Sequence, residues 1–389
     1  MGCNQSAPAA AAAPTGSKCP KLLSPVTLGD LQLRNRVVMA PLTRGRAGAP
    51  RVPNDRMVTY YAQRAEHTGL IIAEATCVNL EGEGWVDSPG IYTPEHAAGW
   101  KKVVDAVKAK GCPMVLQLWH LGRAAHSSFM GGKQVVSASA TKIDGSTFGN
   151  DGTTYAADGT KQPWEEARAL ETSEIPALIE AYRRGAELAK EAGFDGVEVH
   201  SASGYLLDQF LQSSTNKRTD QYGGSKENRL RLLTEILDAV FTVFPASRVA
   251  VRLSPNGGFN DMGSEDNIET FTYALQELSK KGLGYMHVMD GLGFGFHKKT
   301  EAFTIEAMRK CYPGKLMCNV GYTRDSAEKV ISEGSADCVA FGRPFISNPD
   351  LALRFATDAP LAESDANTWF SHDDEGYATY PTLAEAAKK

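Results

Sequence analysis

The residue pair best suited to chemistry in this chain is a histidine followed, one short loop later, by a tyrosine. His200 ends the apolar run Gly196–His200, and Tyr205 lies just beyond the loop that follows. An imidazole at the end of a buried strand and a phenol on the next loop can act on opposite ends of one small polarised substrate. Taken alone, such a pair is more often structural than catalytic. Its meaning depends on the elements that position it.

Eight candidate strands alternate with helical segments along the chain. The strands are expected at Val37–Ala40, Leu70–Ala75, Met114–Trp119, Gly196–His200, Val249–Leu253, Tyr285–Met289, Leu316–Asn319 and Cys338–Phe341. Amphipathic helices, several of them closed by a glycine, are expected at Pro94–Lys110, Ile175–Ala192, Lys226–Phe244 and Glu265–Lys281. Eight strand–helix units that close on themselves make an α/β fold of the (β/α)8 TIM barrel type. A doubly wound sheet is disfavoured because no G-x-G-x-x-G follows the first strand.

Two additions to the barrel are expected. Val26–Leu33 alternates around the turn dipeptide Gly29-Asp30, which predicts an N-terminal hairpin lid. The long segment Gly131–Leu170 is rich in Gly, Ser, Thr and Asp and fits an insertion after the third strand, with a hairpin flanking the site. We predict a disordered N-terminal segment over residues 1–20 and one barrel domain over residues 21–389.

The composition is that of an ordinary globular protein and disfavours several classes of function. The chain has 41 basic and 46 acidic residues, a net charge of −5 and no run of Lys or Arg, so nucleic acid is not expected as a partner. No apolar stretch reaches the roughly 18 residues that a membrane-spanning helix requires. The seven cysteines form no C-x-x-C pair, and no metal site is expected. With no secretory leader, the predicted location is the reducing cytoplasm.

The N-terminus carries a separate signal. Met1–Ser6 fits the M-G-x-x-x-[ST] pattern of myristoylation at Gly2, and the neighbouring Cys3 could take a palmitoyl chain. Stable anchoring would need both chains, because one myristoyl group binds a membrane only marginally and no polybasic patch is present. Two alternatives stay open: a lipidated terminus that tethers a cytoplasmic protein to a membrane, or a chance match in a frayed end.

The carboxyl ends of the strands carry the active site in a TIM barrel. No candidate strand ends in lysine, which argues against Schiff-base chemistry. At the ends of the last two strands, Gly321, Gly342 and Arg343 could offer backbone N–H groups and a guanidinium to a phosphate. Polar side chains at other strand ends, able to hydrogen-bond the edge of a flat heteroaromatic ring, are Thr43, Gln117 and Arg252. A phosphate site together with a polar-edged ring site describes flavin mononucleotide (FMN).

Several long motifs, in order along the chain, resemble the Old Yellow Enzyme family. They are Leu23–Gly29, Asn35–Arg44, Gln117–Arg123, Gly204–Leu211, Asn216–Gly224, Val251–Pro255, Val339–Arg343 and Asn348–Leu351, within a match from about Leu22 to Pro381. The resemblance implies an FMN-dependent ene-reductase that uses NAD(P)H to reduce the C=C bond of α,β-unsaturated carbonyl compounds in a ping-pong cycle. Thr43, where other members have cysteine, resembles the plant, yeast and enterobacterial subgroup.

The resemblance also implies roles for individual positions. Residues that would contact the flavin ring are Pro41, Leu42, Thr43, Ala75, Gln117 and Arg252, the last beside N1–C2=O. Residues that would hold the phosphate are Val320, Gly321, Gly342 and Arg343. Trp119, Trp369 and Phe370 would wall the substrate pocket, although aromatic residues can equally be core. His200 would bind the substrate carbonyl, and Tyr205 would donate the proton.

The chain departs from the family pattern at one substrate-binding position. Ser203 stands where the family has Asn or His, so the second hydrogen-bond donor to the substrate oxygen is a short hydroxyl. Val320 also departs from the usual glycine, with little expected consequence because that contact would be through backbone. Barrel relatives with an iron–sulfur cluster are disfavoured for lack of a cysteine cluster. A flavin-binding protein that has lost its activity stays open, supported only by Ser203. The preference between NADH and NADPH, the physiological enone and the oligomeric state are left open.

Overall fold

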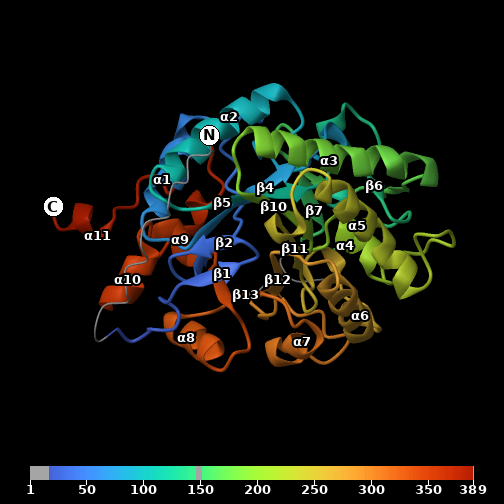
Figure 1. Cartoon of the computed structure of the whole chain (residues 1–389). Coiled ribbons are helices and arrows are strands. Elements are labelled where there is room, and N and C mark those ends of the chain that lie inside the picture. Colours follow the sequence, from blue (N-terminus) through green and yellow to red (C-terminus); the bar gives the residue numbers. More distant parts are fainter. Residues whose placement is uncertain (1–16, 146–150, 294, 389) are drawn as a thin grey trace, which may run out of the picture.

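The computed structural model describes residues 17–145, 151–293 and 295–388, which surround a closed barrel of eight parallel strands (Figure 1). The strands around the barrel are β3 (Val37–Met39), β4 (Leu70–Cys77), β5 (Met114–Trp119), β10 (Gly196–Ser201), β11 (Val249–Leu253), β12 (Tyr285–Met289), β13 (Leu316–Asn319) and β14 (Cys338–Phe341). Closure follows because β14 pairs in parallel with β3. The predicted TIM barrel is confirmed, and each predicted strand is present with its ends within two residues of those expected.

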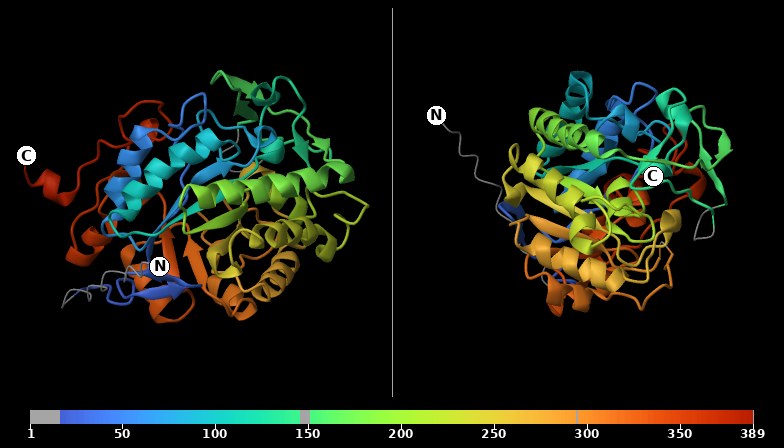
Figure 2. Two further views of the ribbon diagram at one scale, coloured as in Figure 1. Left: turned by 45° about the horizontal axis from the view of Figure 1, so that its top comes forward. Right: turned by 90° about the vertical axis from the view of Figure 1, so that its right-hand side faces the viewer.

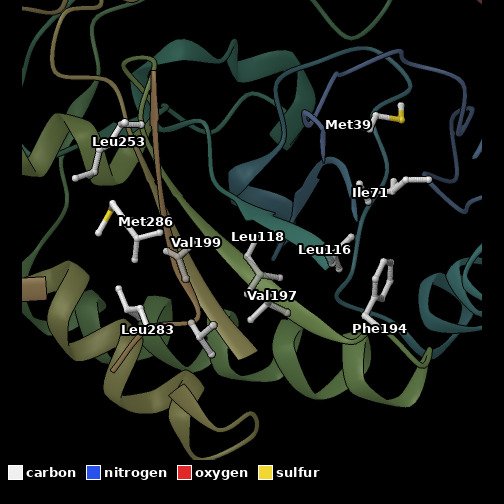
Figure 3. Close-up of a cluster of buried hydrophobic side chains, with 14 of the residues drawn as sticks. Met39, Ile71, Leu116, Leu118, Phe194, Val197, Val199, Leu253, Leu283 and Met286 are labelled. Atoms are coloured by element: carbon white, nitrogen blue, oxygen red, sulfur yellow. The ribbon is translucent and has the colours of Figure 1, made fainter. Parts of the chain in front are cut away.

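Side chains alternate along the barrel strands between the barrel interior and the layer beneath the helices. In β3, Val38 packs with the interior cluster, whereas Val37 and Met39 belong to the outer core. The outer core includes the labelled side chains Leu116, Leu118, Val197 and Val199 (Figure 3). Burial of both faces explains why these strands are nearly continuous apolar runs in the sequence.

Helices cover the outside of the barrel (Figure 1). The four helices named from the sequence are α2 (Pro94–Lys108), α3 (Ile175–Glu191), α5 (Lys226–Phe241) and α6 (Asn267–Ser279). Gly111, Gly193 and Gly282 follow α2, α3 and α6 with φ of +69°, +92° and +70°, which is the left-handed conformation of a helix end. Further helices are α1 (Asp55–Ala65), α4 (Leu206–Leu211), α7 (Ile305–Cys311), α8 (Arg324–Ser332), α9 (Arg343–Ser347), α10 (Leu351–Thr357) and α11 (Leu383–Ala386).

The predicted N-terminal hairpin is formed by β1 (Val26–Leu28) and β2 (Leu31–Leu33). Its apolar side chains pack with the interior cluster of the barrel. Gly29, with φ of +60°, lies so close to Ser247 that an added Cβ would stand 1.9 Å from the Ser247 carbonyl oxygen. Because Ser247 comes just before β11, the hairpin closes the amino end of the barrel. The lid is therefore at the end opposite the carboxyl ends of the strands.

The predicted insertion follows β5, the third strand of the barrel. It contains β6 (Val136–Ser137), β7 (Thr153–Tyr155), β8 (Lys161–Pro163) and β9 (Arg168–Ala169), with β7 and β8 paired as an antiparallel hairpin. The insertion and the β1–β2 hairpin lie on opposite sides of the molecule (Figure 2). The insertion thus belongs to the end of the barrel where the strands terminate.

The predicted acylation sites Gly2 and Cys3 lie outside the described residues. The first described residues pack on the barrel domain: Cys19 is fully buried and its thiol donates to the Phe355 carbonyl at 3.5 Å. Lys18 forms an ion pair with Asp358 at 2.6 Å. Lys18 and Cys19, which the prediction placed in the disordered segment, therefore contact the barrel domain. Within the described ranges, no helix is both long and apolar enough to cross a membrane.

Candidate active site

A cavity of about 550 Å³ opens where the barrel strands end. Every residue that the sequence analysis assigned to a cofactor or a substrate lines it. These residues are Pro41, Leu42, Thr43, Ala75, Gln117, Trp119, His200, Ser203, Tyr205, Arg252, Val320, Gly321, Gly342, Arg343, Trp369 and Phe370. The barrel topology thus brings side chains from nearly the whole length of the chain to one space.

His200, Tyr205 and Trp119 form one aromatic cluster in this cavity. The ring centroids of His200 and Tyr205 are 5.1 Å apart, and those of Trp119 and Tyr205 are 4.9 Å apart. Burial, helped by the charge of Arg252, lowers the pKa of His200 well below its usual value. Burial also raises the pKa of Tyr205. At neutral pH the imidazole is therefore uncharged and the phenol keeps its proton.

Nδ1 of His200 is buried and has no hydrogen-bond partner among the described residues. A buried polar atom without a partner costs free energy, so its presence beside a cavity indicates a group that binds there. A neutral imidazole can offer one N–H donor to a ligand oxygen.

The loop between His200 and Tyr205 has an unusual backbone. Ser203 has φ of +59° and Gly204 has φ of +73°, so two consecutive residues are left-handed. The Ser203 N–H donates to Ser254 Oγ at 2.7 Å, and its carbonyl accepts from Asn260 Nδ2 at 2.9 Å. The Ser203 hydroxyl donates to the Met289 sulfur at 3.4 Å. Because a thioether is a weak acceptor, this hydroxyl can exchange that contact for a better one.

Inward-facing polar side chains form a layer beneath the cavity. Gln117 Nε2 donates to Glu198 Oε1 at 2.7 Å, and Glu198 Oε2 lies 2.9 Å from His287 Nδ1. Burial would raise the pKa of Glu198, but His287 and Arg252 outweigh it and lower that pKa, which keeps the carboxylate charged. Arg252 Nη2 donates to Asn319 Oδ1 at 2.7 Å. Since Gln117 gives its amide N–H to Glu198, its carbonyl oxygen remains for a donor in the cavity.

The far end of the cavity follows β13 and β14. Gly321 has φ of +84°, and a Cβ added there would meet no atom of the described residues within 4 Å. Val320 also has φ of +84°, a conformation that costs a β-branched residue about 1–3 kcal/mol. The expectation that Val320 has little consequence rested on a contact through its backbone, and the sequence analysis did not foresee that this backbone is strained. The Arg343 guanidinium lies 5.1 Å from the centre of the Trp369 ring.

One wall of the cavity comes from residues 368–377, which we term the C-terminal strap. Two arginines, each almost fully buried, hold its carbonyl groups. Arg44 donates to Trp369 O at 3.0 Å and to Gly376 O at 2.8 Å, and Arg46 donates to Thr368 O at 2.9 Å. These bonds fix the segment that brings Trp369 and its neighbour Phe370 to the cavity.

A second cavity, of about 420 Å³, adjoins the first beneath the β7–β8 hairpin. The two cavities share four lining residues, which are Trp85, Tyr205, Phe259 and Phe370. The rings of Trp85 and Phe370 lie 5.1 Å apart. Tyr205 therefore stands at the boundary between the two spaces.

Several residues at the site were not named from the sequence. Lining residues of this kind include Arg44, Trp85, Phe259, Met289, Gly293, Pro344 and Ile346. Glu198 and His287 lie beneath the cavity and were also missed. A signal for Glu198 was available, because it stands two residues before His200 on one strand and must share its face. Trp85 lies in a loop and Phe259 in a single 3-10 turn (Phe259–Asp261), both too short for periodicity to indicate the direction of a side chain.

Comparison with known proteins places the chain among flavin enzymes. The model of the NADH:flavin oxidoreductase / NADH oxidase family matches residues 21–362. 12-Oxophytodienoate reductase 1 of Oryza sativa subsp. japonica is 41% identical over 368 residues, which are 94% of this chain and 93% of that protein. 12-Oxophytodienoate reductase 2 of Arabidopsis thaliana is 37% identical over 374 residues, covering 94% and 96%.

Solved structures of flavin enzymes are also similar to this chain. A structure of morphinone reductase has 42% sequence identity and a TM-score of 0.89, covering 96% of this chain and 100% of that one. The old yellow enzyme homologue from Zymomonas mobilis has 39% identity and a TM-score of 0.88, covering 94% and 100%. The similarity therefore extends over sequence and fold together.

Proposed function

Because this chain belongs to the NADH:flavin oxidoreductase / NADH oxidase family and is an FMN-dependent ene-reductase of the Old Yellow Enzyme type, we propose how its cavity residues divide the reaction. His200 binds the carbonyl oxygen of an α,β-unsaturated carbonyl substrate, and Tyr205 donates a proton to the α-carbon. The observation that carries this proposal is the pairing, in one cavity, of an uncharged imidazole with a protonated phenol at 5.1 Å between ring centroids.

The residues around the cavity fit FMN. A flavin ring presents both acceptors and an N–H donor on its pyrimidine edge. These suit the Nε of Arg252, which has no partner in the described part of the chain, and the carbonyl oxygen of Gln117. Pro41, Leu42, Thr43 and Ala75 would hold the rest of the ring. The open space at Gly321, with Val320, Gly342 and the guanidinium of Arg343, suits the phosphate. When bound, FMN would supply the hydride transfer from NAD(P)H to the β-carbon of the enone.

The protein's own contribution is charge stabilisation and proton transfer. Hydride addition at the β-carbon places negative charge on the substrate oxygen, and the His200 N–H donates to that oxygen. Tyr205 gives its hydroxyl proton to the α-carbon, which completes saturation of the bond. The second cavity also reaches Tyr205, so solvent can return the proton there. Trp119, Trp369 and Phe370 wall the substrate and limit the access of water.

The sequence analysis left open a flavin-binding protein that has lost its activity, and a colour assay tests for it directly. The purified protein should be yellow, should bleach with NADPH under anaerobic conditions and should regain its colour with 2-cyclohexenone. Colour that bleaches but does not return with any enone would favour the inactive alternative.

Among the described residues, no group of three His, Cys, Asp or Glu side chains could hold a metal ion.

The replacement Ser203→Asn should improve substrate binding. One neutral donor to a developing oxyanion is worth about 10²–10³ in rate, and an Asn amide reaches farther than a serine hydroxyl. Asn also tolerates a positive φ better than most residues, so the backbone at +59° can be kept. We expect kcat/KM for 2-cyclohexenone to rise by about tenfold or more and phenol binding to tighten.

Ser203→Ala is the matched control. It removes the hydroxyl and should change kcat/KM little if Ser203 reaches the carbonyl only through water. A large loss in Ser203→Ala, with no gain in Ser203→Asn, would mean that the serine already supplies the second donor.

We further propose that the N-terminus is a membrane address. A variant that starts near Lys18 should keep its flavin and its activity, because the sequence of Gly2–Gly16 contains nothing that could build core. In a eukaryotic host the full chain should sediment with membranes, and Gly2→Ala should release it. Cys3→Ser should give weaker, reversible binding, because one acyl chain is insufficient. If the wild-type protein stays entirely in the supernatant, the proposal is contradicted and the Met1–Ser6 match to the acylation pattern is a coincidence.

A further inference from the structure

We propose that Asp208 is a positioning residue for the proton donor, because its buried carboxylate holds the loop that joins His200 to Tyr205. The proposal rests on the assignment of Tyr205 as the donor. Asp208 lies in the first turn of α4 and is fully buried. It lines neither cavity, so it can act on the substrate only through other residues.

The Asp208 carboxylate accepts hydrogen bonds from the loop itself and from residues that pack against it. Asp208 Oδ2 accepts from the Gly204 N–H at 2.9 Å and from the Ser254 hydroxyl at 3.4 Å. Ser254 Oγ in turn accepts the Ser203 N–H at 2.7 Å. Asp208 Oδ1 accepts from Gln212 Nε2 at 2.9 Å. Two successive backbone N–H groups, those of Ser203 and Gly204, are thus fixed by one carboxylate, one of them through Ser254.

This loop needs such support because its backbone is not in a favoured conformation. Ser203 is a non-glycine residue at φ +59°, and Gly204 follows at +73°. No larger residue fits at Gly204, where an added Cβ would lie 2.6 Å from Asn260 Cβ. Tyr205 comes next and is the N-cap of α4. A change in the loop backbone would therefore rotate the phenol relative to His200.

The charge of Asp208 matters because all three groups bonded to it, those of Gly204, Ser254 and Gln212, are donors. Burial raises the pKa of Asp208 to about 6, and the hydrogen bonds from Gln212, Gly204 and Ser254 and the charge of Arg123 limit that rise. Above pH 6 the carboxylate is charged and accepts the hydrogen bond from the backbone N–H of Gly204. As the pH falls through 6 the group gains a proton, becomes a donor and loses acceptor capacity. Proton transfer from Tyr205 should therefore weaken below pH 6.

Asp208→Asn is the direct test, measured by anaerobic stopped-flow in the two half-reactions. We expect full FMN content and near-normal flavin reduction by NADPH. Flavin reoxidation by 2-cyclohexenone should slow by about tenfold at pH 7.5, since small misplacement of a catalytic group is costly. The fall of that rate below pH 6 should also disappear, which a merely structural role would not produce.

The double variant with Tyr205→Phe decides whether Asp208 acts through the phenol. If it does, Asp208→Asn should add little further loss in the Tyr205→Phe background, because contacts that work as one unit are not additive. Additive losses, or equal slowing of both half-reactions, would overturn the proposal. If Tyr205→Phe alone has no selective effect, the assignment of the donor fails instead.

Two further variants guard against a folding artefact. Asp350 is another buried carboxylate, bonded to Arg354 at 2.7 Å and outside both cavities. Asp350→Asn should lower the thermal stability without changing the ratio of the half-reactions. If Asp208→Asn does not fold, Ser254→Ala removes only the relay to Ser203 and should slow reoxidation selectively. No selective effect in Ser254→Ala would then count against the proposal.

Discussion

Tyr205→Phe should slow flavin reoxidation by 2-cyclohexenone by about 10²-fold or more and leave flavin reduction by NADPH near normal. Only the oxidative half-reaction requires a proton at the α-carbon. Burial raises the pKa of Tyr205, so the wild-type phenol stays protonated across the usual assay range and is a donor throughout it. Phenylalanine keeps the ring that packs 4.9 Å from Trp119 and removes only the hydroxyl.

The two rates are measured separately by anaerobic stopped-flow at the flavin absorbance. Tyr182→Phe is the matched control, because Tyr182 is fully buried on α3, outside both cavities, and its hydroxyl has no partner among the described residues. That control should change neither rate. Equal slowing of both half-reactions in Tyr205→Phe would mean that Tyr205 is structural and that the donor is elsewhere.

The barrel could be predicted from the sequence because its strands are buried on both faces. Strands such as Met114–Trp119 and Val249–Leu253 are short apolar runs between helical segments, and the structure has them with the expected ends. Helix ends were less accurate: Lys226–Phe244 was expected where α5 ends at Phe241. The apolar pattern continues through Val243 and Phe244, although the hydrogen-bonded helix has already ended.

The residues of the site could be predicted because parallel strands deliver their carboxyl ends to one place. His200 and Arg252 are neighbours in the register of β10 and β11, so the same face receives both. Ala75 is a residue whose direction the alternation of side chains along a strand does not predict. Strict alternation from Ile72, which faces the interior, would turn Ala75 outward. A register shift between Ala73 and Thr76 in β4 instead puts it on the cavity.

The features of the site that could not be predicted from the sequence depend on contacts between residues far apart in the chain. Nothing near Arg44 or Arg46 indicates that these side chains bind carbonyls of the C-terminal strap more than 300 positions away. The backbone of Ser203 is likewise invisible in the sequence, because serine has no preference for a positive φ. The substitution at Ser203 could be recognised, but the Asp208 and Ser254 contacts that hold it could not.

The strap also changes how Arg343 should be understood. Its guanidinium stacks on Trp369, which the buried arginines Arg44 and Arg46 hold through backbone carbonyls. Arg343 could therefore serve the phosphate of FMN directly, or serve the cavity wall by supporting Trp369. The two roles predict different responses to a flavin without a phosphate.

Arg343→Ala should weaken FMN binding by about 30-fold or more, because a charge-assisted, bidentate contact with a phosphate is among the stronger polar interactions. Riboflavin has the same ring without the phosphate, and its affinity should hardly change. Titration of the apoprotein with both flavins, followed by fluorescence quenching, gives the ratio of the two dissociation constants. Arg343→Lys should recover part of the difference, since it keeps the charge but loses the planar fork. If riboflavin binding weakens as much as FMN binding, Arg343 acts through Trp369 and the phosphate is held by the backbone of Gly321 and Gly342.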